Sequence, residues 1–263
     1  MLDAFGLSVQ SRGQVTKMTS RRAAHRIESL LLRSVSWWGS KLVVNPFHRV
    51  FYYSNRETWG DTTWLGVPLR KCPLDLWVYQ EILEEVRPTV IVECGTAFGG
   101  SALYLASICG LLGHGEVITV DVEVEAYPNR PVHDRITYVE GSSTAPETVS
   151  RVKELIAGRE PVMVILDSDH SKQHVLEELR LYEPLVSRCS YLIVEDTNVN
   201  GHPVLHNFGP GPGEAVAEFT QESSELIRDS TREKYLLTFN PNGYLFKRTQ
   251  PDQPRGVPVD ASS

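Results

Sequence analysis

The chain has 263 residues, of which 41% are hydrophobic and 22% charged, with a formal net charge of −7 at pH 7. No apolar run reaches the ~18 residues that a membrane helix needs, and no basic stretch followed by an apolar one opens the chain, so neither a stable membrane anchor nor a secretory signal is expected. Residues 1–50 hold eight basic and two acidic side chains, and the acidic remainder disfavours nucleic acid as a partner. Four widely spaced cysteines without a C-x-x-C pair indicate reduced thiols in a cytoplasmic protein.

Residues 1–45 are predicted to form an N-terminal extension. From Ser20 to Trp38 apolar residues recur at three- and four-residue steps with arginines on the other side, which predicts a basic amphipathic helix. Such a helix can lie on a membrane surface, but packing on its own domain or on a second subunit is favoured, because two signals for stable anchoring are not evident. A homodimer is therefore expected.

Residues 46–88 are rich in aromatic side chains and are interpreted as a lid or cap segment. The aromatic residues are Phe47, Phe51, Tyr52, Tyr53, Trp59 and Trp64. They suit a wall that stacks on a substrate, and they equally suit a plain hydrophobic core. The segment ends in a predicted helix from Pro73 to Val86, which stops before Pro88.

The stretch TVIVECGTAFGGS, Thr89 to Ser101, organises the predicted main domain at residues 89–250. A buried strand from Thr89 to Glu93 is expected to lead through a glycine turn into a helix, which makes a nucleotide-binding corner because the helix N-terminus offers unpaired N–H groups. The spacing E-x-G-x-x-x-G-G-S resembles the first motif of class I S-adenosylmethionine (SAM) methyltransferases. The resemblance implies that Glu93 helps to hold the methionine end of the cofactor. It also implies contacts from the turn residues Gly95, Thr96, Ala97, Gly99, Gly100 and Ser101.

Strands and helices then alternate regularly. Strands are expected at Glu116–Val122, Ile136–Val139, Val162–Leu166 and Tyr191–Val194, and helices at Glu147–Ala157, Ser171–Val186 and Glu214–Ile227. Tyr235–Phe239 and Tyr244–Lys247 flank an Asn-Pro-Asn-Gly turn and are expected to pair as an antiparallel hairpin. The fold class is therefore α/β, with a doubly wound, mostly parallel, Rossmann-like sheet in the class I methyltransferase order and a flexible tail at 251–263.

Three polar residues at strand ends are expected to contact the nucleoside part of the cofactor. Asp121 ends the second strand, where a carboxylate suits a bidentate hydrogen bond to ribose hydroxyls. Ser142 and Ser143 follow the third strand, where the adenine would lie.

Four acids, Asp167, Asp169, Glu195 and Asp196, fall just past the ends of two predicted adjacent strands. They are expected to face the same crevice as the glycine turn, and converging carboxylates repel one another unless a cation or a proton lies between them. Oxygen ligands favour Mg²⁺ or Ca²⁺ over zinc. The alternative is a set of unrelated helix caps, since Asp169 directly precedes a predicted helix.

Several segments resemble the cephalosporin hydroxylase/rhamnosyl O-methyltransferase family over roughly Trp59 to Lys247. They are DSDHSKQHV, YLIVEDTN and HPV with GPGPGEAV, and upstream WLGVPL, PLDLW and QEIL. The resemblance implies a Mg²⁺-dependent SAM methyltransferase, and the sugar-acting members methylate hydroxyls of rhamnose or related hexoses. It implies Asp169, Glu195 and Asp196 as metal ligands. The more distant catechol-type enzymes would put the first ligand at Asp167, which is therefore kept as a ligand or a cofactor neighbour.

The expected reaction is methyl transfer from SAM to a hydroxyl of a neutral hexose or deoxyhexose in a glycolipid, polysaccharide or glycosylated natural product. A dication lowers the pKa of a coordinated hydroxyl, and a base must take its proton. His170 is the first candidate for that base and His202 the next, with His206 on the same loop. His174 is expected to be structural.

Two other functions are kept as alternatives. His170 and His174, four residues apart, could join a carboxylate in the two-His-one-carboxylate site of a non-haem iron oxygenase or cephem-type hydroxylase. The chain could also be a non-catalytic SAM- or sugar-binding subunit of a partner enzyme. Oxygen uptake that depends on iron would support the first alternative, and the absence of turnover by the purified chain would support the second.

Overall fold

The computed structural model describes residues 42–123 and 125–249. The chain divides into two units, Met1–Phe47 and His48–Ser263. The helix predicted for Ser20–Trp38 and the tail predicted at 251–263 lie outside the described residues, whereas residues 42–53 are helical. Within the described part of the chain, no helix is long and apolar enough to cross a membrane.

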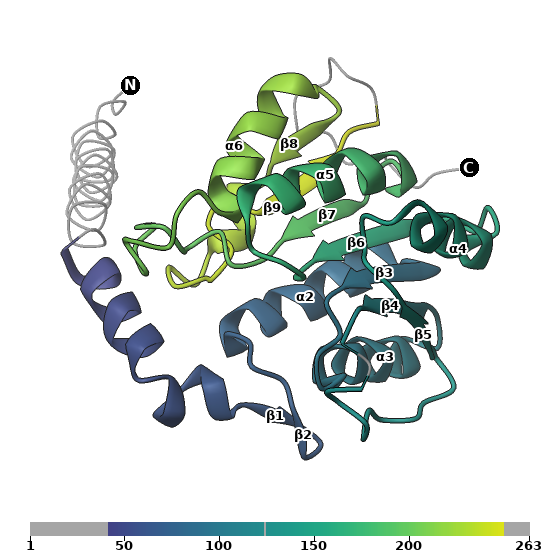
Figure 1. Ribbon diagram of the computed structural model, residues 1–263, viewed down its shortest axis with the longest axis horizontal. Coiled ribbons are helices and arrows are strands. Elements are labelled where there is room, and N and C mark those ends of the chain that lie inside the picture. Colours follow the sequence, from purple (N-terminus) through teal and green to yellow (C-terminus); the bar gives the residue numbers. More distant parts are fainter. Residues whose placement is uncertain (1–41, 124, 250–263) are drawn as a thin grey trace, which may run out of the picture. The chain divides into compact units, whose positions relative to one another are not determined.

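The second unit is built on a seven-stranded sheet with the order β5-β4-β3-β6-β7-β9-β8 (Figure 1). Its parallel strands are β3 (Val90–Cys94), β4 (Glu116–Asp121), β5 (Ile136–Glu140), β6 (Val162–Leu166) and β7 (Tyr191–Val194). β9 (Tyr244–Lys247) is antiparallel to β7, and β8 (Leu226–Arg228) is antiparallel to β9. The strand order reverses at β3, so the carboxyl ends of β3 and β6 flank the crevice in which such sheets bind ligands. The predicted doubly wound, mostly parallel sheet is confirmed.

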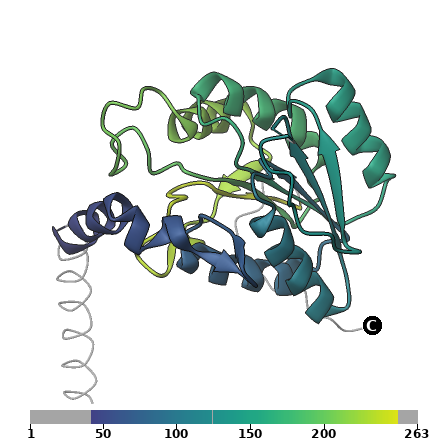
Figure 2. The same cartoon turned by 60° about the horizontal axis from the view of Figure 1, so that its bottom comes forward.

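Helices cover both faces of this sheet (Figures 1 and 2). One side carries α2 (Pro73–Val86) and α3 (Gly100–Leu112), and the other carries α4 (Pro146–Ile156), α5 (Lys172–Tyr182) and α6 (Pro212–Glu222). Alternate residues of β3 enter the two cores, since Val90 and Val92 pack with α4, α5 and α6 and Ile91 packs with α2 and α3. Burial on both faces explains why the parallel strands are continuous apolar runs.

The C-terminal antiparallel pair uses a different segment from the one predicted. β9 pairs with Leu226–Arg228 rather than with Tyr235–Phe239, and α6 ends at Glu222, before the predicted helix end at Ile227. Tyr235–Phe239 instead follows a 3₁₀ turn at Ser230–Glu233, and its Phe239 packs against the aromatic residues near the N-terminus of this unit. The contacts that hold Phe239 are distant in sequence, so local strand propensity gave the wrong partner.

The predicted cap segment contains a short hairpin, β1 (Thr63–Trp64) and β2 (Val67–Pro68), before α2. The indole of Trp64 packs edge-on against Tyr104 with 4.9 Å between ring centroids, and its Nε1 donates to Ser107 Oγ at 3.0 Å. Tyr52 and Trp59 are 5.2 Å apart and stacked, and both contact the ring of Phe239. Much of the aromatic side-chain surface in the cap is therefore used for packing.

Replacing Asp75 with Ala is expected to lower the free energy of unfolding by about 3 kcal/mol. Asp75 on α2 is 3% exposed and accepts hydrogen bonds from Thr238 Oγ1 at 2.5 Å, Phe239 N at 2.8 Å and the Tyr244 hydroxyl at 2.9 Å. Alanine would leave all three buried donors without this acceptor. Urea unfolding measures the loss, and Glu84→Ala on the exposed face of the same helix is the control. Equal effects of the two substitutions would contradict the prediction.

Candidate active site

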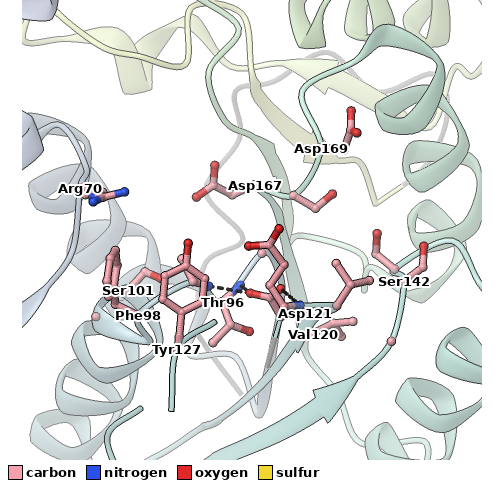
Figure 3. Close-up of a pocket in the computed structure, with 18 of the residues that line it drawn as sticks. Arg70, Thr96, Phe98, Ser101, Val120, Asp121, Tyr127, Ser142, Asp167 and Asp169 are labelled. Carbon is pink, nitrogen blue, oxygen red and sulfur yellow. Dashed lines mark hydrogen bonds between the residues drawn. The ribbon is translucent and has the colours of Figure 1, made fainter. Parts of the chain in front are cut away.

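A pocket of about 500 Å³ opens at the carboxyl ends of the parallel strands (Figure 3). Such a volume suits a small-molecule ligand or cofactor. Most of the residues predicted to bind the cofactor line it, namely Gly95, Thr96, Ala97, Gly100, Ser101, Asp121, Ser142, Ser143 and Asp167. The structure thus brings together side chains from the turn after β3, the ends of β4 and β5, and the loop after β6.

Glu93 and Gly99 do not line the pocket. Glu93 is fully buried at the end of β3, and its Oε2 accepts a hydrogen bond from Thr119 Oγ1 at 2.7 Å. Burial raises the pKa of this carboxyl, although the charge of Lys71 and hydrogen bonds from Ser101 and Thr119 oppose the increase. Gly99 is the N-cap of α3 in the left-handed conformation. The two residues therefore belong to the strand and the helix that flank the turn, and neither lines the pocket.

Asp121 is held rigidly at the end of β4. Its Oδ2 accepts from the backbone N–H groups of Thr96 at 3.0 Å and Ala97 at 2.7 Å, and from Arg130 Nη2 at 2.9 Å. Its Oδ1 accepts from the N–H of Glu123 at 2.8 Å. Asp121 therefore fixes the glycine turn beside β4, and Glu123 lines the same pocket as a second carboxylate that the sequence analysis did not single out.

A lysine that the sequence analysis also missed lies between the acids at the ends of β6 and β7. Lys71 Nζ is 2.6 Å from Asp167 Oδ2 and 2.6 Å from Glu195 Oε1. Burial opposes its charge, but Asp167 and Glu195 outweigh burial and raise the pKa of Lys71. Burial and the neighbouring charge of Asp167 raise the pKa of Glu195 to about 8, although Lys71 opposes this. Burial also acts on Asp167, but Lys71 and His170 hold the pKa of Asp167 below its usual value.

His170 lies between two of the acids. Its Nε2 is 3.3 Å from Asp167 Oδ1, and its Nδ1 is 3.6 Å from Asp196 Oδ2. One ligand atom from each of these three residues lies within 4.8 Å of the others, the spacing of a group able to hold a metal ion. Burial lowers the pKa of His170, but the hydrogen bond to Asp167 and the charges of Asp196, Asp167 and Glu195 raise it to about 9. The imidazole is therefore protonated at neutral pH with these partners.

The predicted set of Asp169, Glu195 and Asp196 is not the group that the structure brings together. Asp169 is exposed, and its Oδ1 accepts the N–H of Ser171 at 2.7 Å at the start of α5. This contact is not the helix cap weighed as the alternative, because Ser171 and not Asp169 is the N-cap of α5. Asp169 lines the pocket, whereas Asp167 faces His170. Glu195 is near the cluster but is paired with Lys71.

The other histidines lie apart from this cluster. His202 Nε2 is 2.8 Å from Glu214 Oε1 on an exposed loop, where the pair bridges to α6. The ring of His206 lies beside Gly201 on the same loop, with Nδ1 3.1 Å from the position that a Cβ would take there. His174 Nε2 bonds Ser143 Oγ at 3.0 Å, and its pairing with Glu178 helps to raise its pKa. His170 and His174 do not share one metal group, so the described residues do not assemble the two-His-one-carboxylate site of an iron oxygenase.

Comparison with known proteins places the chain in a family. Residues 56–248 match the family described as Rhamnosyl O-methyltransferase/CmcI. The chain belongs to this family. The rhamnosyl O-methyltransferase of Mycobacterium tuberculosis (strain ATCC 25618 / H37Rv) is 42% identical over 215 residues, which cover 79% of this chain and 86% of the relative. That of Mycobacterium leprae (strain TN) is 39% identical over 212 residues, which cover 78% and 91%.

Solved structures of CmcI share the fold of this Rhamnosyl O-methyltransferase/CmcI family member. The CmcI-N160 apo structure aligns with a TM-score of 0.58 at 22% identity, over 73% of this chain and 78% of that one. A CmcI-D160 structure described as Mg-SAM aligns with a TM-score of 0.55 at 20% identity, over 72% and 77%. The fold is that of class I SAM-dependent methyltransferases, as the sequence predicted.

Arg70 is a further pocket residue of this family member that the sequence analysis missed. Among the described residues that line the pocket it is the only Lys or Arg, and these residues also include the carboxylates of Asp121, Glu123, Asp167 and Asp169. Its guanidinium carbon lies 4.6 Å from the centroid of the Phe98 ring, and Phe98 in turn contacts Tyr127 edge-on at 4.6 Å. Figure 3 shows Arg70, Phe98 and Tyr127 on one side of the pocket and Ser142 on the other. No local sequence pattern marks Arg70. Its side chain reaches the pocket only because the cap segment folds beside the sheet.

Proposed function

We propose that the protein is a Mg²⁺-dependent O-methyltransferase that transfers the methyl group of SAM to a hydroxyl of a neutral hexose or deoxyhexose. The main support for the proposal is that the pocket adjoins the acid cluster, which we define as Asp167, His170 and Asp196. Asp167 belongs to both. The names of the mycobacterial relatives support a sugar acceptor. The match covers 86% of the length of the Mycobacterium tuberculosis relative, which supports the same class of activity in this chain. The acceptor belongs to a glycolipid, polysaccharide or glycosylated natural product.

The residues of the pocket fit SAM. The turn at Gly95–Ala97 and Asp121 line the pocket, Ser142 and Ser143 would contact the adenine, and Arg70 would offer a positive charge to the carboxylate of the amino-acid end. The N-terminus of α3 adds backbone N–H groups beside Gly100 and Ser101, which favour a negative group there. Asp167 belongs both to the pocket that would hold SAM and to the group of acids that would hold a cation.

The residues of the cluster fit a hard cation. Asp167 and Asp196 contribute carboxylate oxygens. Burial raises the pKa of Asp196, and the charge of Asp167 adds to the increase although His170 and Lys71 oppose it. A dication would relieve the repulsion between the two carboxylates. Bound Mg²⁺ would lower the pKa of a coordinated hydroxyl and SAM would supply the methyl group. Since Mg²⁺ prefers oxygen ligands, His170 is better suited to accept the hydroxyl proton than to bind the ion. A cation nearby would lower the pKa of the imidazole from about 9 and free it to act as a base.

The cap segment borders this chemistry on the acceptor side. Burial and the charge of Asp196 raise the pKa of Tyr52 to about 12, which puts this aromatic residue within electrostatic range of the cluster. Tyr53 is more exposed, and its hydroxyl accepts a hydrogen bond from the N–H of Leu205 at 2.9 Å. We propose that the exposed Tyr53, with Tyr52 beside it, contacts the sugar, rather than Trp59 and Trp64.

A methyl-transfer assay with SAM tests the proposal. A panel of neutral sugars and one phenol is incubated with purified protein, and the methylated position is read by mass spectrometry and NMR. We expect transfer to a sugar hydroxyl, loss of activity with EDTA and recovery with excess Mg²⁺. Transfer only to the phenol would refute the sugar acceptor, and full activity in EDTA would refute the metal. The absence of any turnover would favour the non-catalytic subunit, while the homodimer and the cytoplasmic location stay predictions.

Replacing Arg70 with Ala is expected to raise the KM for SAM about tenfold and to change kcat by less than threefold. The guanidinium would be a cationic partner for the cofactor carboxylate, and a charged hydrogen bond contributes about 1.5–3 kcal/mol. Initial rates over a range of SAM concentrations measure this change. Arg56→Ala, at an exposed position of the cap, serves as the control. An unchanged KM in the Arg70 variant would show that the carboxylate binds elsewhere.

A further inference from the structure

Lys71 is a buried cation that joins the cap segment to the acid cluster. It directly precedes Cys72, the N-cap of α2, and its side chain is only 5% exposed. Its backbone N–H lies 3.3 Å from Thr62 Oγ1, so the backbone is held within the cap while the ammonium reaches the ends of β6 and β7. Neither acid partner is near in sequence, since they lie 96 and 124 residues away.

Burying an ammonium group costs free energy unless opposite charges repay it. Here the ion pairs of Lys71 with Asp167 and Glu195, both at 2.6 Å, offset that cost. They also neutralise negative charge that would otherwise attract a cation to the same place. Asp167 divides its oxygens, because Oδ2 faces Lys71 and Oδ1 faces His170. Lys71 and a metal held by the carboxylates of Asp167 and Asp196 would therefore share one carboxylate, that of Asp167.

We propose that Lys71 is a built-in counter-ion of the acid cluster, which holds the cap on the sheet in the absence of metal and limits the affinity of the cluster for a divalent cation. The inference rests on the metal site of the proposed function and adds a regulator of its affinity. Lys71 is a positioning residue, because it acts through Asp167 and Glu195. Its positive charge repels a dication at close range, and its contacts to the cap and to both strand ends stabilise the metal-free protein.

The test compares wild type with Lys71→Met, which keeps an unbranched apolar chain of nearly the same length and removes the charge. Mn²⁺ and Mg²⁺ binding is measured by titration calorimetry at pH 8, and Tm is measured with and without metal. We expect Lys71→Met to bind Mn²⁺ at least about tenfold more tightly, because a repelling charge has been removed. We also expect its Tm to be lower than that of wild type without metal and to recover most of the difference with metal. Lys234→Met removes an exposed ion pair with Glu81 and should change neither quantity.

The outcomes separate this inference from the proposed function. Equal Mn²⁺ affinity in wild type and variant would refute the counter-ion role and leave the metal site standing. A Tm loss of the same size with and without metal would show an ordinary structural contact and would also refute it. Binding by the variant alone would support the role of Lys71 and refute metal dependence of the wild type, and binding by neither would refute both. Lys71→Gln, which keeps a donor, gives the same comparison if Lys71→Met does not fold.

Discussion

Replacing Asp196 with Asn is expected to lower kcat/KM for methyl transfer by about 10²-fold or more, since loss of a ligand should exceed the 10–100-fold cost of outer-shell changes around metals. Asp196 Oδ2 lies 3.6 Å from His170 Nδ1, and the backbone of Asp196 is in the left-handed region with φ of 52°. Asparagine has the same shape and tolerates that conformation, so the fold should persist. The substitution removes the negative charge that would bind the cation and orient the imidazole.

Steady-state kinetics and Mn²⁺ titration of the same preparation measure the effect, and circular dichroism checks the fold. Asp169→Asn is the comparison, because its side-chain oxygen can still accept the N–H of Ser171. We expect that variant to lose no more than about tenfold, the low end of the range for residues outside the ligand set. Losses of about 10²-fold or more in both variants would support the ligand set of Asp169, Glu195 and Asp196 that the sequence implied. Little loss in Asp196→Asn would refute the cluster of Asp167, His170 and Asp196.

The sheet could be predicted because its strands carry their own signal. The runs Val162–Leu166 and Tyr191–Val194 are uniformly apolar and bounded by polar residues, and the structure has both strands with these bounds. The C-terminal pair could not be predicted in the same way. Leu226–Arg228 has three residues and no alternation, whereas Tyr235–Phe239 has the better local composition but is held by Asp75 and the cap. Contacts across 164 residues decided between them.

The candidate site shows the same division between local and distant information. The acids at the strand ends could be found because the carboxyl ends of parallel strands meet at one edge. Which acid faces inward depends on the path of the loop after β6, where Asp167 and Asp169 lie two residues apart and the start of α5 engages Asp169. Lys71, Arg70 and Glu123 carry no motif. The cap and the loop after β4 bring Arg70 and Glu123 to the pocket, and the cap brings Lys71 to the acids at the ends of β6 and β7, so only the structure reveals them.

Replacing Gly95 with Ala is expected to destabilise the fold by more than about 4 kcal/mol and to abolish cofactor binding, because the added group meets backbone rather than a movable side chain. A Cβ at Gly95 would lie 1.9 Å from the carbonyl oxygen of Asp167 and 2.5 Å from its carbonyl carbon. The φ of Gly95 is +101°, which side chains rarely adopt. Relief of the overlap must separate the turn after β3 from the end of β6, and this movement would displace Asp167 from the pocket and from Lys71.

Gly113→Ala separates the two causes of this loss. Gly113 also has a positive φ, +67°, at the C-cap of α3, but nothing lies within 4 Å of its Cβ position. Its replacement should cost only the left-handed strain of about 1 kcal/mol and leave SAM binding intact. Urea unfolding and SAM titration of both variants give the comparison. If Gly95→Ala instead lost no more stability than Gly113→Ala and still bound SAM, then SAM binding would not require the close contact between Gly95 and the backbone of Asp167.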